Sequence, residues 1–245
     1  MDKDNNTDMK HTEEKERNFV HLHLHTAFSA LDGAIKIEKL AESLKEKGMD
    51  MCAITDHGVM YGIIDFYKTM KKYDIKPIIG SEFYIAPDSR HNKKDHYKVG
   101  DDTNYHLVLL AENNEGLQNL YKLSTLGFLE GFYRKPRIDK EILKQYSKGI
   151  IALSACLGGE ISRKFLKEGY DAAKKAAIEY DEILGRGNYF LEIQENGIPE
   201  QKIVNNQLIQ ISKETGIPLV ATCDSHYLNK EDYSSHNILM QILLL

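Results

Sequence analysis

The sequence predicts an α/β protein in which parallel strands alternate with helices, either as a barrel or as a doubly wound sheet. Three observations support this prediction. Short apolar runs of strand length recur along the chain, amphipathic stretches with helical spacing separate them, and seven such runs fit within 245 residues. A slightly small (β/α) barrel accounts for that number of strands.

The elements follow one another in a regular order. The predicted strands cover residues 19–25, 51–55, 76–80, 105–111, 149–154, 188–194 and 217–222. The predicted helices cover residues 35–47, 61–73, 114–129, 170–184 and 200–215. Gly48 follows the first helix, in a position where glycine commonly ends a helix. Residues 87–104 are polar and predict a mobile loop, and residues 1–18 predict a disordered extension ahead of one domain over residues 19–245.

Composition excludes several classes of protein. Apolar residues make up 42% of the chain and charged residues 28%, a balance typical of globular proteins. No apolar run approaches the roughly 20 residues of a membrane span, and residues 1–18 are too polar for a signal peptide. The net charge of −5 creates no general attraction for nucleic acid, so any such contact has to be local. Three cysteines indicate reduced thiols and a cytoplasmic protein.

Residues that can bind metals gather where the predicted strands end. In chain order they are His21, His23 and His25, then Asp56 and His57, Glu82, Cys156, and finally Asp224 and His226. In a barrel of parallel strands these side chains converge on one rim, which is where such proteins hold their active sites. His106 is an exception because it begins its run. Either that strand starts earlier than predicted or His106 reaches the site in another way.

The chemistry of this set indicates a multinuclear metal centre. Histidines two residues apart on a strand point to the same face, as do Asp224 and His226. Imidazoles, carboxylates and one thiol suit zinc, manganese or iron, whereas calcium and magnesium prefer oxygen ligands. The set exceeds the four ligands of one zinc site. Several ions together activate water as hydroxide and neutralise charge on a phosphoryl group.

Each motif alone also has a simpler interpretation. A single H-x-H pair is often hydrogen-bonded or solvated, Asp32-Gly33 suits a turn, and an isolated Cys156 is commonly a small buried apolar group. The histidines in polar or helical stretches are expected to be solvated: His11, His91, His96 and His236. The occurrence of all the motifs together, in order and at strand ends, favours the metal centre.

The motifs resemble those of a known family. In chain order they are HLHLHT (21–26), LDG (31–33), ITDHG (54–58), GSE (80–82), HLVLLA (106–111), LSACLGGE (153–160) and CDSH (223–226). As a set, they resemble the PHP (polymerase and histidinol phosphatase) superfamily. Three more stretches, DFY (65–67), KPIIG (76–80) and FLEGFYRKPRID (128–139), are similar to the N-terminal PHP domain of bacterial DNA polymerase III alpha subunits. This resemblance extends over residues 19–245.

The resemblance implies a distorted (β/α)7 barrel that holds up to three divalent transition-metal ions. The ligands that it implies are His23, His25, Asp32, His57, Glu82, His106, Cys156, Asp224 and His226. Asp56 is expected to support these ligands without binding metal, and His21 is expected to be their neighbour. The apolar end of the chain, residues 237–245, suits a domain taken from a longer polymerase.

The implied function is a metal-dependent phosphoesterase domain of a replicative DNA-directed DNA polymerase, with 3′–5′ proofreading exonuclease as its most specific activity. A hydroxide held by the metal ions would attack phosphorus in line. The aromatic and basic cluster expected to hold the DNA backbone or stack a base, with a solvated loop as its alternative, is Tyr133, Arg134, Lys135 and Arg137. A weaker DNA-contact candidate, more typical of a charged loop, is Arg90, Lys93, Lys94 and Lys98.

The resemblance also implies partners, and it leaves two other functions open. The implied partners are the 3′ end of a DNA primer strand, the rest of the polymerase alpha subunit and a separate proofreading subunit, with no membrane. One alternative is a phosphatase that acts on a small phosphomonoester such as histidinol phosphate. The other is a structural scaffold in which the metal only stabilises the domain.

Overall fold

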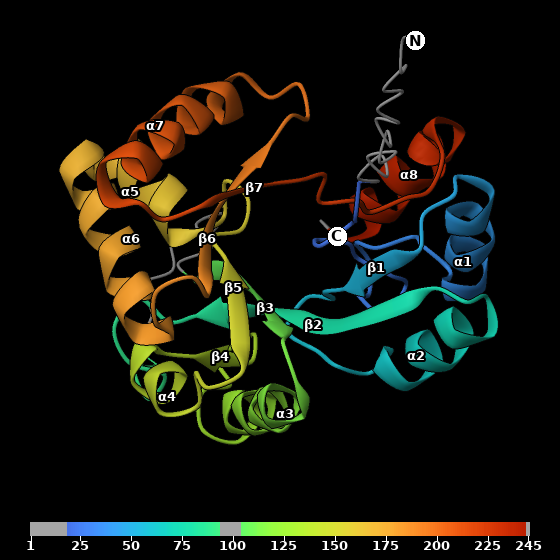
Figure 1. Ribbon diagram of the computed structural model, residues 1–245, viewed down its shortest axis with the longest axis horizontal. Coiled ribbons are helices and arrows are strands. Elements are labelled where there is room, and N and C mark those ends of the chain that lie inside the picture. The colour runs from blue at the N-terminus through green and yellow to red at the C-terminus, as the bar shows by residue number, and fades with distance from the viewer. Residues whose placement is uncertain (1–18, 94–103, 244–245) are drawn as a thin grey trace, which may run out of the picture.

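The computed structural model describes residues 19–93 and 104–243, and its mixed α/β architecture confirms the predicted fold class (Figure 1). The strands form one curled sheet in the order β1-β2-β3-β5-β6-β7, with β4 paired to β2. Their bounds are β1 (Met51–Ile54), β2 (Lys76–Ile85), β3 (Tyr105–Ala111), β4 (Arg137–Ile138), β5 (Ile150–Leu153), β6 (Tyr189–Gln194) and β7 (Leu219–Thr222). Figure 1 shows these strands running through the middle of the molecule, with the helices arranged around the outside.

The helices include all five that the sequence predicts. They are α1 (Ile37–Glu46), α2 (Ile63–Lys72), α3 (Asn114–Leu129), α4 (Lys140–Gln145), α5 (Glu160–Glu168), α6 (Tyr170–Leu184), α7 (Pro199–Thr215) and α8 (Tyr233–Leu243), with a short 3₁₀ turn at Lys230–Asp232. Gly48 follows α1 with φ 67°, as expected for a helix-ending glycine. The short helices α4 and α5 were not predicted. α8 includes residues 237–243 of the apolar end, and residues 244–245 lie outside the described residues.

The first predicted strand, residues 19–25, is not a regular strand in the structure. Residues 19–25 form only isolated bridges, because they lie between β1 and the segment that follows β7 rather than along one partner. The N–H of Ala53 donates to the carbonyl of His21 at 2.7 Å, and the N–H of His25 donates to the carbonyl of Ser225 at 2.9 Å. This segment therefore joins the two edges of the curled sheet and closes a distorted barrel.

The direction of β3 corrects the expectation of parallel strands throughout. β3 runs antiparallel to both β2 and β5, whereas β1 with β2, β5 with β6, and β6 with β7 are parallel pairs. An antiparallel neighbour needs no crossover helix, and the sequence between β2 and β3 carries no helical pattern. The N-terminal end of β3 thus lies beside the C-terminal ends of its neighbours. This explains how His106 reaches the rim although its strand begins where predicted, at Tyr105.

Strand β2 is longer than predicted, and this changes the setting of Glu82. The sequence predicts a strand that ends at Gly80, but β2 continues to Ile85 and pairs Glu82 with Val108 of β3. Glu82 therefore lies inside a strand, not in the turn after it. Its side chain is consequently fixed by the sheet and points into the barrel.

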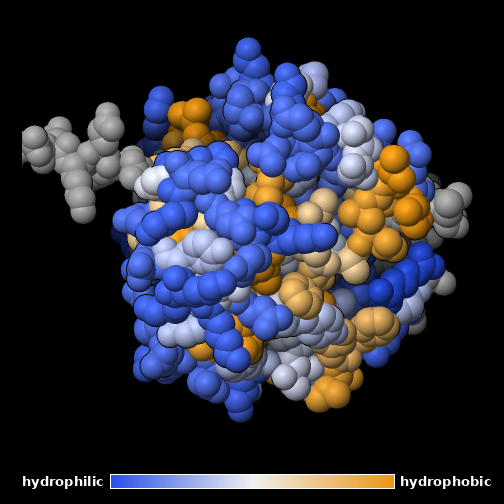
Figure 2. Space-filling model, turned by 90° about the vertical axis from the view of Figure 1, so that its right-hand side faces the viewer, coloured by the Kyte–Doolittle hydropathy of each residue, from blue (hydrophilic) through white to orange (hydrophobic). Residues whose placement is uncertain are grey.

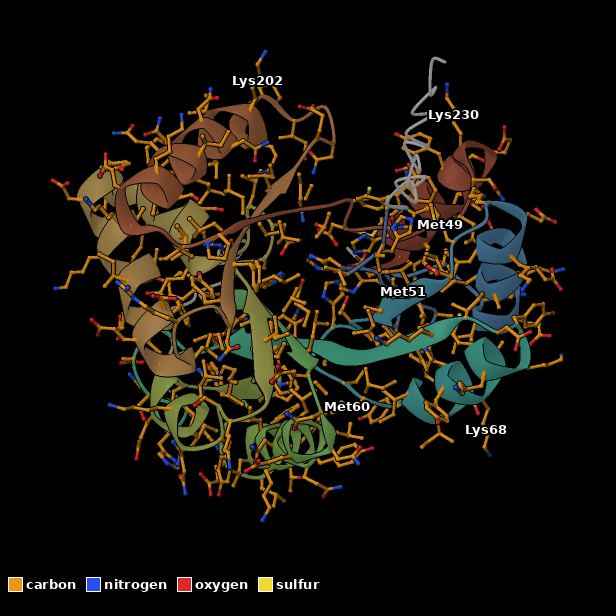
Figure 3. The ribbon with its side chains drawn as sticks, viewed as in Figure 1. Met49, Met51, Met60, Lys68, Lys202 and Lys230 are labelled. Atoms are coloured by element: carbon orange, nitrogen blue, oxygen red, sulfur yellow. The ribbon has the colours of Figure 1, made fainter. Side chains whose placement is uncertain are left out.

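The apolar core surrounds the barrel and also fills one end of it. The largest cluster packs β2, β3, β5 and β6 against helices α3 to α7, and a second packs β1 against α1 and α2. Met60, labelled in Figure 3, is half-buried and contacts both clusters. A third cluster, drawn from alternate residues on the strands, includes Ala53, Val108 and Leu153. Within the described ranges, no helix has the length and apolar character needed to cross a bilayer.

Some apolar side chains remain exposed on the outer helices. Ile64 of α2, Leu129 of α3 and Ile238 of α8 are all more than half exposed. Figure 2 shows hydrophobic residues gathered in patches on an otherwise largely hydrophilic face. Scattered apolar residues are ordinary on a protein surface, whereas a contiguous apolar patch is typical of a binding site.

Candidate metal centre

The inward face of the strands changes from apolar to polar along the barrel. On β3, Leu110 and Val108 belong to the third core cluster, and His106 follows on the same face. At β7, Val220 packs against that cluster, and Asp224 lies just beyond the end of the strand. The alternation of side chains along a strand therefore places an apolar plug below and a group of metal-type ligands above it.

The structure brings all nine expected ligand residues to this polar end. Three groups of side chains have donor atoms within 4.8 Å of one another: His25, His57 and His226; His23, His25 and Asp224; and His57, Glu82 and His106. Asp32 Oδ2 lies 2.9 Å from His57 Nε2, and Cys156 Sγ lies 4.0 Å from His106 Nδ1. Because His25 and His57 each belong to two groups, the groups form one continuous cluster.

Glu82 lies at the centre of this cluster with only 1% of its surface exposed. Its Oε2 is 2.8 Å from His23 Nε2, while its Oε1 is 2.9 Å from His57 Nδ1 and 2.7 Å from His106 Nδ1. Burial would raise the pKa of this carboxyl, but the imidazoles of His106 and His57 outweigh burial and hold the pKa well below its usual range. Glu82 is thus an ionised carboxylate shared among three imidazoles.

The donor atoms around His23 and His25 fit a cation. The two Nε2 atoms are 3.1 Å apart, and Asp224 Oδ1 lies 3.2 Å from that of His23 and 3.1 Å from that of His25. Within the described part of the chain, this buried Oδ1 has no hydrogen-bond partner. Burial, reinforced by neighbouring His57, lowers the pKa of His25 to about 3, so His25 is neutral at pH 7. Lone pairs that converge in this way are the arrangement a divalent ion requires.

Hydrogen bonds behind His25 orient it toward that position. The carboxylate of Asp56 accepts bonds from the Thr26 N–H at 2.6 Å and from the Ser29 hydroxyl at 2.7 Å. Because Ser29 gives its only hydroxyl proton to Asp56, its oxygen accepts from His25 Nδ1–H at 3.2 Å. Nε2 of His25 is then unprotonated and available to a metal. Asp56 thus acts on His25 through the hydroxyl of Ser29.

Glu192 is a second supporting carboxylate, which the sequence reasoning missed. It is fully buried on β6, and its Oε1 accepts from His23 Nδ1–H at 2.7 Å and from Gln194 Nε2 at 2.9 Å. The hydroxyl of Thr222 donates to the same oxygen. A carboxylate behind a histidine fixes its tautomer and strengthens it as a ligand. The available signal was a charged residue within the apolar run YFLEIQ, which strand alternation alone would assign to solvent.

The negative charge of the cluster draws protons onto some imidazoles. Burial would lower the pKa of His57, but the carboxylates of Glu82 and Asp32 outweigh burial and raise the pKa to about 10. At His23, the carboxylates of Asp224 and Glu192 likewise overcome burial and raise the pKa well above its ordinary value. The cluster therefore requires positive charge, which divalent ions supply in place of protons.

Cys156 stands at the edge of the cluster in a setting that disfavours a free thiolate. Burial, with Asp224 and Glu82 nearby, raises the pKa of the Cys156 thiol well above its ordinary value. A cation is consequently needed to deprotonate this group. Close packing around it depends on Gly158, whose backbone N–H lies 3.4 Å from the sulfur. A Cβ at Gly158 would lie 2.9 Å from Nδ1 of His106 and displace that ring.

A cleft of about 520 Å³ opens directly over the cluster. It is lined by Ala27, Phe28, Ser29, Ala30, Asp32, His57, Val59, Tyr61, Tyr84, His106, Arg134, Lys135 and Pro136. Three of the expected metal ligands therefore share the cleft with two basic side chains. Nζ of Lys135 donates to the Tyr84 hydroxyl at 2.9 Å, and Arg134 lies beside the ring of Tyr133. The cleft therefore places basic side chains beside the metal-type cluster, a setting that suits a phosphate group.

Arg137 corrects the expected DNA-contact cluster. Only 4% of its surface is exposed, and its guanidinium donates to the carbonyls of Gly131, Arg90 and Asn92 at 2.9 to 3.1 Å. A buried arginine that uses its N–H groups on backbone carbonyls cannot also grip DNA. Arg137 instead fixes the turn that carries the other members of the cluster. Tyr133 of that turn is half-buried against the Arg137 guanidinium, with 5.4 Å between the guanidinium carbon and the ring centre.

The weaker basic candidates are only partly described. Arg90 is nearly buried and its guanidinium pairs with Asp139 and Glu130, so it supports the same turn. Lys93 is exposed, whereas Lys94 and Lys98 lie outside the described residues. The expectation of a DNA contact from this stretch is therefore wrong for Arg90.

His236 also differs from expectation, because it is not a solvated histidine. From α8 its Nε2 lies 3.8 Å from Asp32 Oδ1, and its ring centre is 6.0 Å from that of His226. This Nε2 is buried and has no hydrogen-bond partner within residues 19–93 and 104–243. His91 is exposed as predicted, while His11 and His96 lie beyond the described ranges. The imidazole of His236 therefore adjoins the cluster from an element that the motifs did not include.

Comparison with known proteins points to one family. A family model described as the PHP domain matches residues 21–196. The chain is 47% identical over 236 residues to the DNA polymerase III subunit alpha of Helicobacter pylori, and 45% identical over 229 residues to that of Aquifex aeolicus. Each match covers 92% of this chain, but the chain spans only about one fifth of the length of these relatives.

Two solved structures share the fold at low sequence identity. One is a protein from Bifidobacterium adolescentis described as a metal-dependent phosphoesterase, with a TM-score of 0.51. The other is an amidohydrolase from Chromobacterium violaceum with bound sulfate and no metal, with a TM-score of 0.52. Each is 12% identical to this chain. Each match covers 90% of this chain and 96% of the solved structure's chain. They support the distorted barrel fold and nothing more specific.

Proposed function

The chain belongs to the PHP domain family, and from this premise we propose that it is a metal-dependent phosphoesterase that cleaves phosphodiester bonds in DNA. The single observation that carries the proposal is the continuous cluster of imidazoles and carboxylates on the floor of a cleft with basic walls. A cluster of this size exceeds what one structural ion needs. Basic groups beside it match the charge of a phosphodiester.

The nine converging residues are the proposed ligands of up to three zinc, manganese or iron ions. His23, His25 and Asp224 would hold one position, and the groups that share His57 would hold the others. When bound, such ions activate water and neutralise charge on a phosphoryl group. Zinc is favoured by the thiol of Cys156, and manganese or iron by the carboxylates.

The residues of the chain itself would bind and orient the substrate. Arg134 and Lys135 would hold a phosphate against the floor formed by Asp32, His57 and His106. The bond from Lys135 to the Tyr84 hydroxyl steadies the ammonium group above that floor. Ser29 and Glu192 keep the protons of His25 and His23 on Nδ1, so the Nε2 atoms remain turned toward the cluster.

The similarity to polymerase subunits extends the proposal to DNA replication. We infer that residues 19–245 act as the PHP domain of a bacterial DNA polymerase III alpha subunit in the cytoplasm, and that they remove nucleotides from a 3′ end as a proofreading exonuclease. The proposed partners are the 3′ end of the primer strand, the rest of the alpha subunit and a separate proofreading subunit. DNA-directed DNA polymerase activity would belong to the whole subunit, because the chain matches only a fifth of its relatives.

A structural role is a second candidate, favoured by where the ligands lie in the chain. His23 and His25 come from the segment that closes the barrel, while Asp224 and His226 follow the strand at the opposite edge of the sheet. Metal held by both pairs would fasten the two edges together. Such ions could stabilise the barrel without any catalysis.

Hydrolysis assays on the purified chain separate these functions. With manganese or zinc present, we expect hydrolysis of bis(p-nitrophenyl) phosphate and of 3′-labelled single-stranded DNA, and slower hydrolysis of p-nitrophenyl phosphate. Preference for the monoester would indicate a small-molecule phosphatase. Metal-loaded protein that cleaves none of these substrates would favour the structural role.

Removal of one cleft cation tests how the substrate is held. Lys135→Ala is expected to raise KM for DNA by about tenfold, because a charge-assisted contact to phosphate is lost. Lys202→Ala is the matched control, since Figure 3 places Lys202 at the outer end of α7, away from the strands that form the cluster. Equal KM values for Lys135→Ala and the parent protein would contradict this part of the proposal.

A further inference from the structure

We propose that Tyr61, Phe128 and Phe132 form a stacking site for the bases of a single-stranded nucleic acid whose phosphates enter the cleft. These three residues form the aromatic row. This inference rests on the proposed phosphodiesterase function and extends it, because it adds a surface that holds unpaired bases beside the cleft. A small phosphomonoester would fill only the cleft and would not extend beyond Tyr61 to Phe128 and Phe132.

The three rings lie in sequence with related orientations. The ring centres of Tyr61 and Phe128 are 6.5 Å apart with planes tilted by 33°, and those of Phe128 and Phe132 are 6.2 Å apart with planes tilted by 19°. Tyr61 is 66% exposed and Phe132 is 47% exposed, with half-buried Phe128 between them. The outer rings therefore present accessible aromatic faces at both ends of the row.

The row continues directly from the cleft. Tyr61 lines the cleft together with Asp32 and His57 on the floor and with Arg134 and Lys135 on the wall. A strand that places one phosphate over the floor would have its neighbouring nucleotides beside Tyr61. Every base has a π-face, so stacking on such rings requires no particular sequence.

Buried contacts hold the row in place. Gly62, next to Tyr61, packs so closely on Phe28 that a Cβ would lie 2.6 Å from that ring. At the other end, Gly131 precedes Phe132 and has no room for a Cβ against the Arg137 carbonyl, while the Arg137 guanidinium donates to the Gly131 carbonyl. Arg137, which does not reach DNA itself, is thus a positioning residue for the ring that does.

The charge around the row favours nucleic acid over a protein partner. The chain carries a net charge of −5, yet Arg134 and Lys135 lie at the cleft that Tyr61 lines. Cations beside exposed aromatic faces match a ligand with phosphates and planar bases. Docking of a protein segment on the same surface would use the rings but would leave this basic wall unexplained.

Binding of a phosphorothioate oligothymidylate, which resists hydrolysis, tests the proposal on the metal-loaded chain. By fluorescence anisotropy, Tyr61→Ala and Phe132→Ala are each expected to weaken binding by about tenfold, the effect of losing one stacked base. Tyr61→Phe keeps a ring and should bind like the parent. Tyr67→Ala is the matched control, because Tyr67 of α2 is 50% exposed and does not line the cleft.

An oligomer with abasic sugars at its 3′ end makes the test specific for stacking. The parent should bind it about tenfold more weakly than oligothymidylate, and Tyr61→Ala should show a smaller difference between the two. Unchanged affinity in both alanine variants, as a protein-docking surface would give, overturns the aromatic row. Hydrolysis of bis(p-nitrophenyl) phosphate by the parent reports separately on the proposed function. If the alanine variants bind more weakly but the parent hydrolyses no phosphodiester, the aromatic row is supported and the proposed phosphodiesterase function is rejected.

Discussion

Glu82→Gln is expected to lower the rate of metal-dependent phosphodiester hydrolysis by more than about 100-fold. Loss of a residue that only supports a metal ligand lowers activity by about 10- to 100-fold. The substitution keeps the shape of the side chain but removes the charge that three imidazoles share. An amide also turns an N–H donor toward ring nitrogens that face the carboxylate at 2.7 to 2.9 Å. We expect both the bound metal and the rate constant kcat to fall together.

The control for this substitution is Glu179→Gln on α6. Glu179 is a half-exposed carboxylate that pairs with Lys140, outside the metal-binding cluster. The same chemical change there should leave activity and metal content unchanged. Hydrolysis of bis(p-nitrophenyl) phosphate, together with circular dichroism to verify folding, checks both variants. If Glu82→Gln kept more than half of the parent activity, the reaction would have to occur elsewhere.

Removal of metal is expected to lower the melting temperature of the chain by roughly 8–16 °C. A ligand present at about 1,000 times its Kd stabilises a fold by about 4 kcal/mol. A chain of this size changes its Tm by about 2–4 °C per kcal/mol. The effect should be large here because His25 and Asp224 tie the closing segment to the far edge of the sheet.

Calorimetry with and without a chelator measures this change, and returning zinc or manganese should restore the Tm. Asp224→Asn serves as the control, because its Tm should respond little to the chelator. Agreement of the parent Tm within about 2 °C under both conditions would mean that metal does not join the edges of the barrel. That result would also weaken the structural candidate.

The fold class and most elements could be predicted because periodic patterns report directly on secondary structure. The bounds of α3, α6 and β3 agree with the predicted ranges to the residue. The predicted direction of β3 was wrong, because an apolar run has the same pattern in a parallel and in an antiparallel strand. The absence of a helical pattern between residues 80 and 105 was the usable signal.

The metal-type residues were found because histidines and carboxylates at strand ends are conspicuous and convergence follows from barrel geometry. Their supports were harder to see. Glu192 resembles an outward-facing strand residue, and only the closed barrel turns it inward toward His23. The expectation that Arg137 contacts DNA was wrong, because this side chain is held by the carbonyls of Arg90 and Asn92. Those residues are distant in the sequence, so no local pattern reveals the contact. His236 joins the cluster only through the placement of α8.

The number of metal ions bound per chain tests the central claim most directly. Protein purified without chelator should contain at least two divalent transition-metal ions per chain by elemental analysis, because the side chains that converge here outnumber the four ligands of one zinc site. The ratio should fall in Glu82→Gln and remain unchanged in Glu179→Gln. A ratio of one or less in the parent, even after incubation with excess zinc or manganese, would contradict a multinuclear centre.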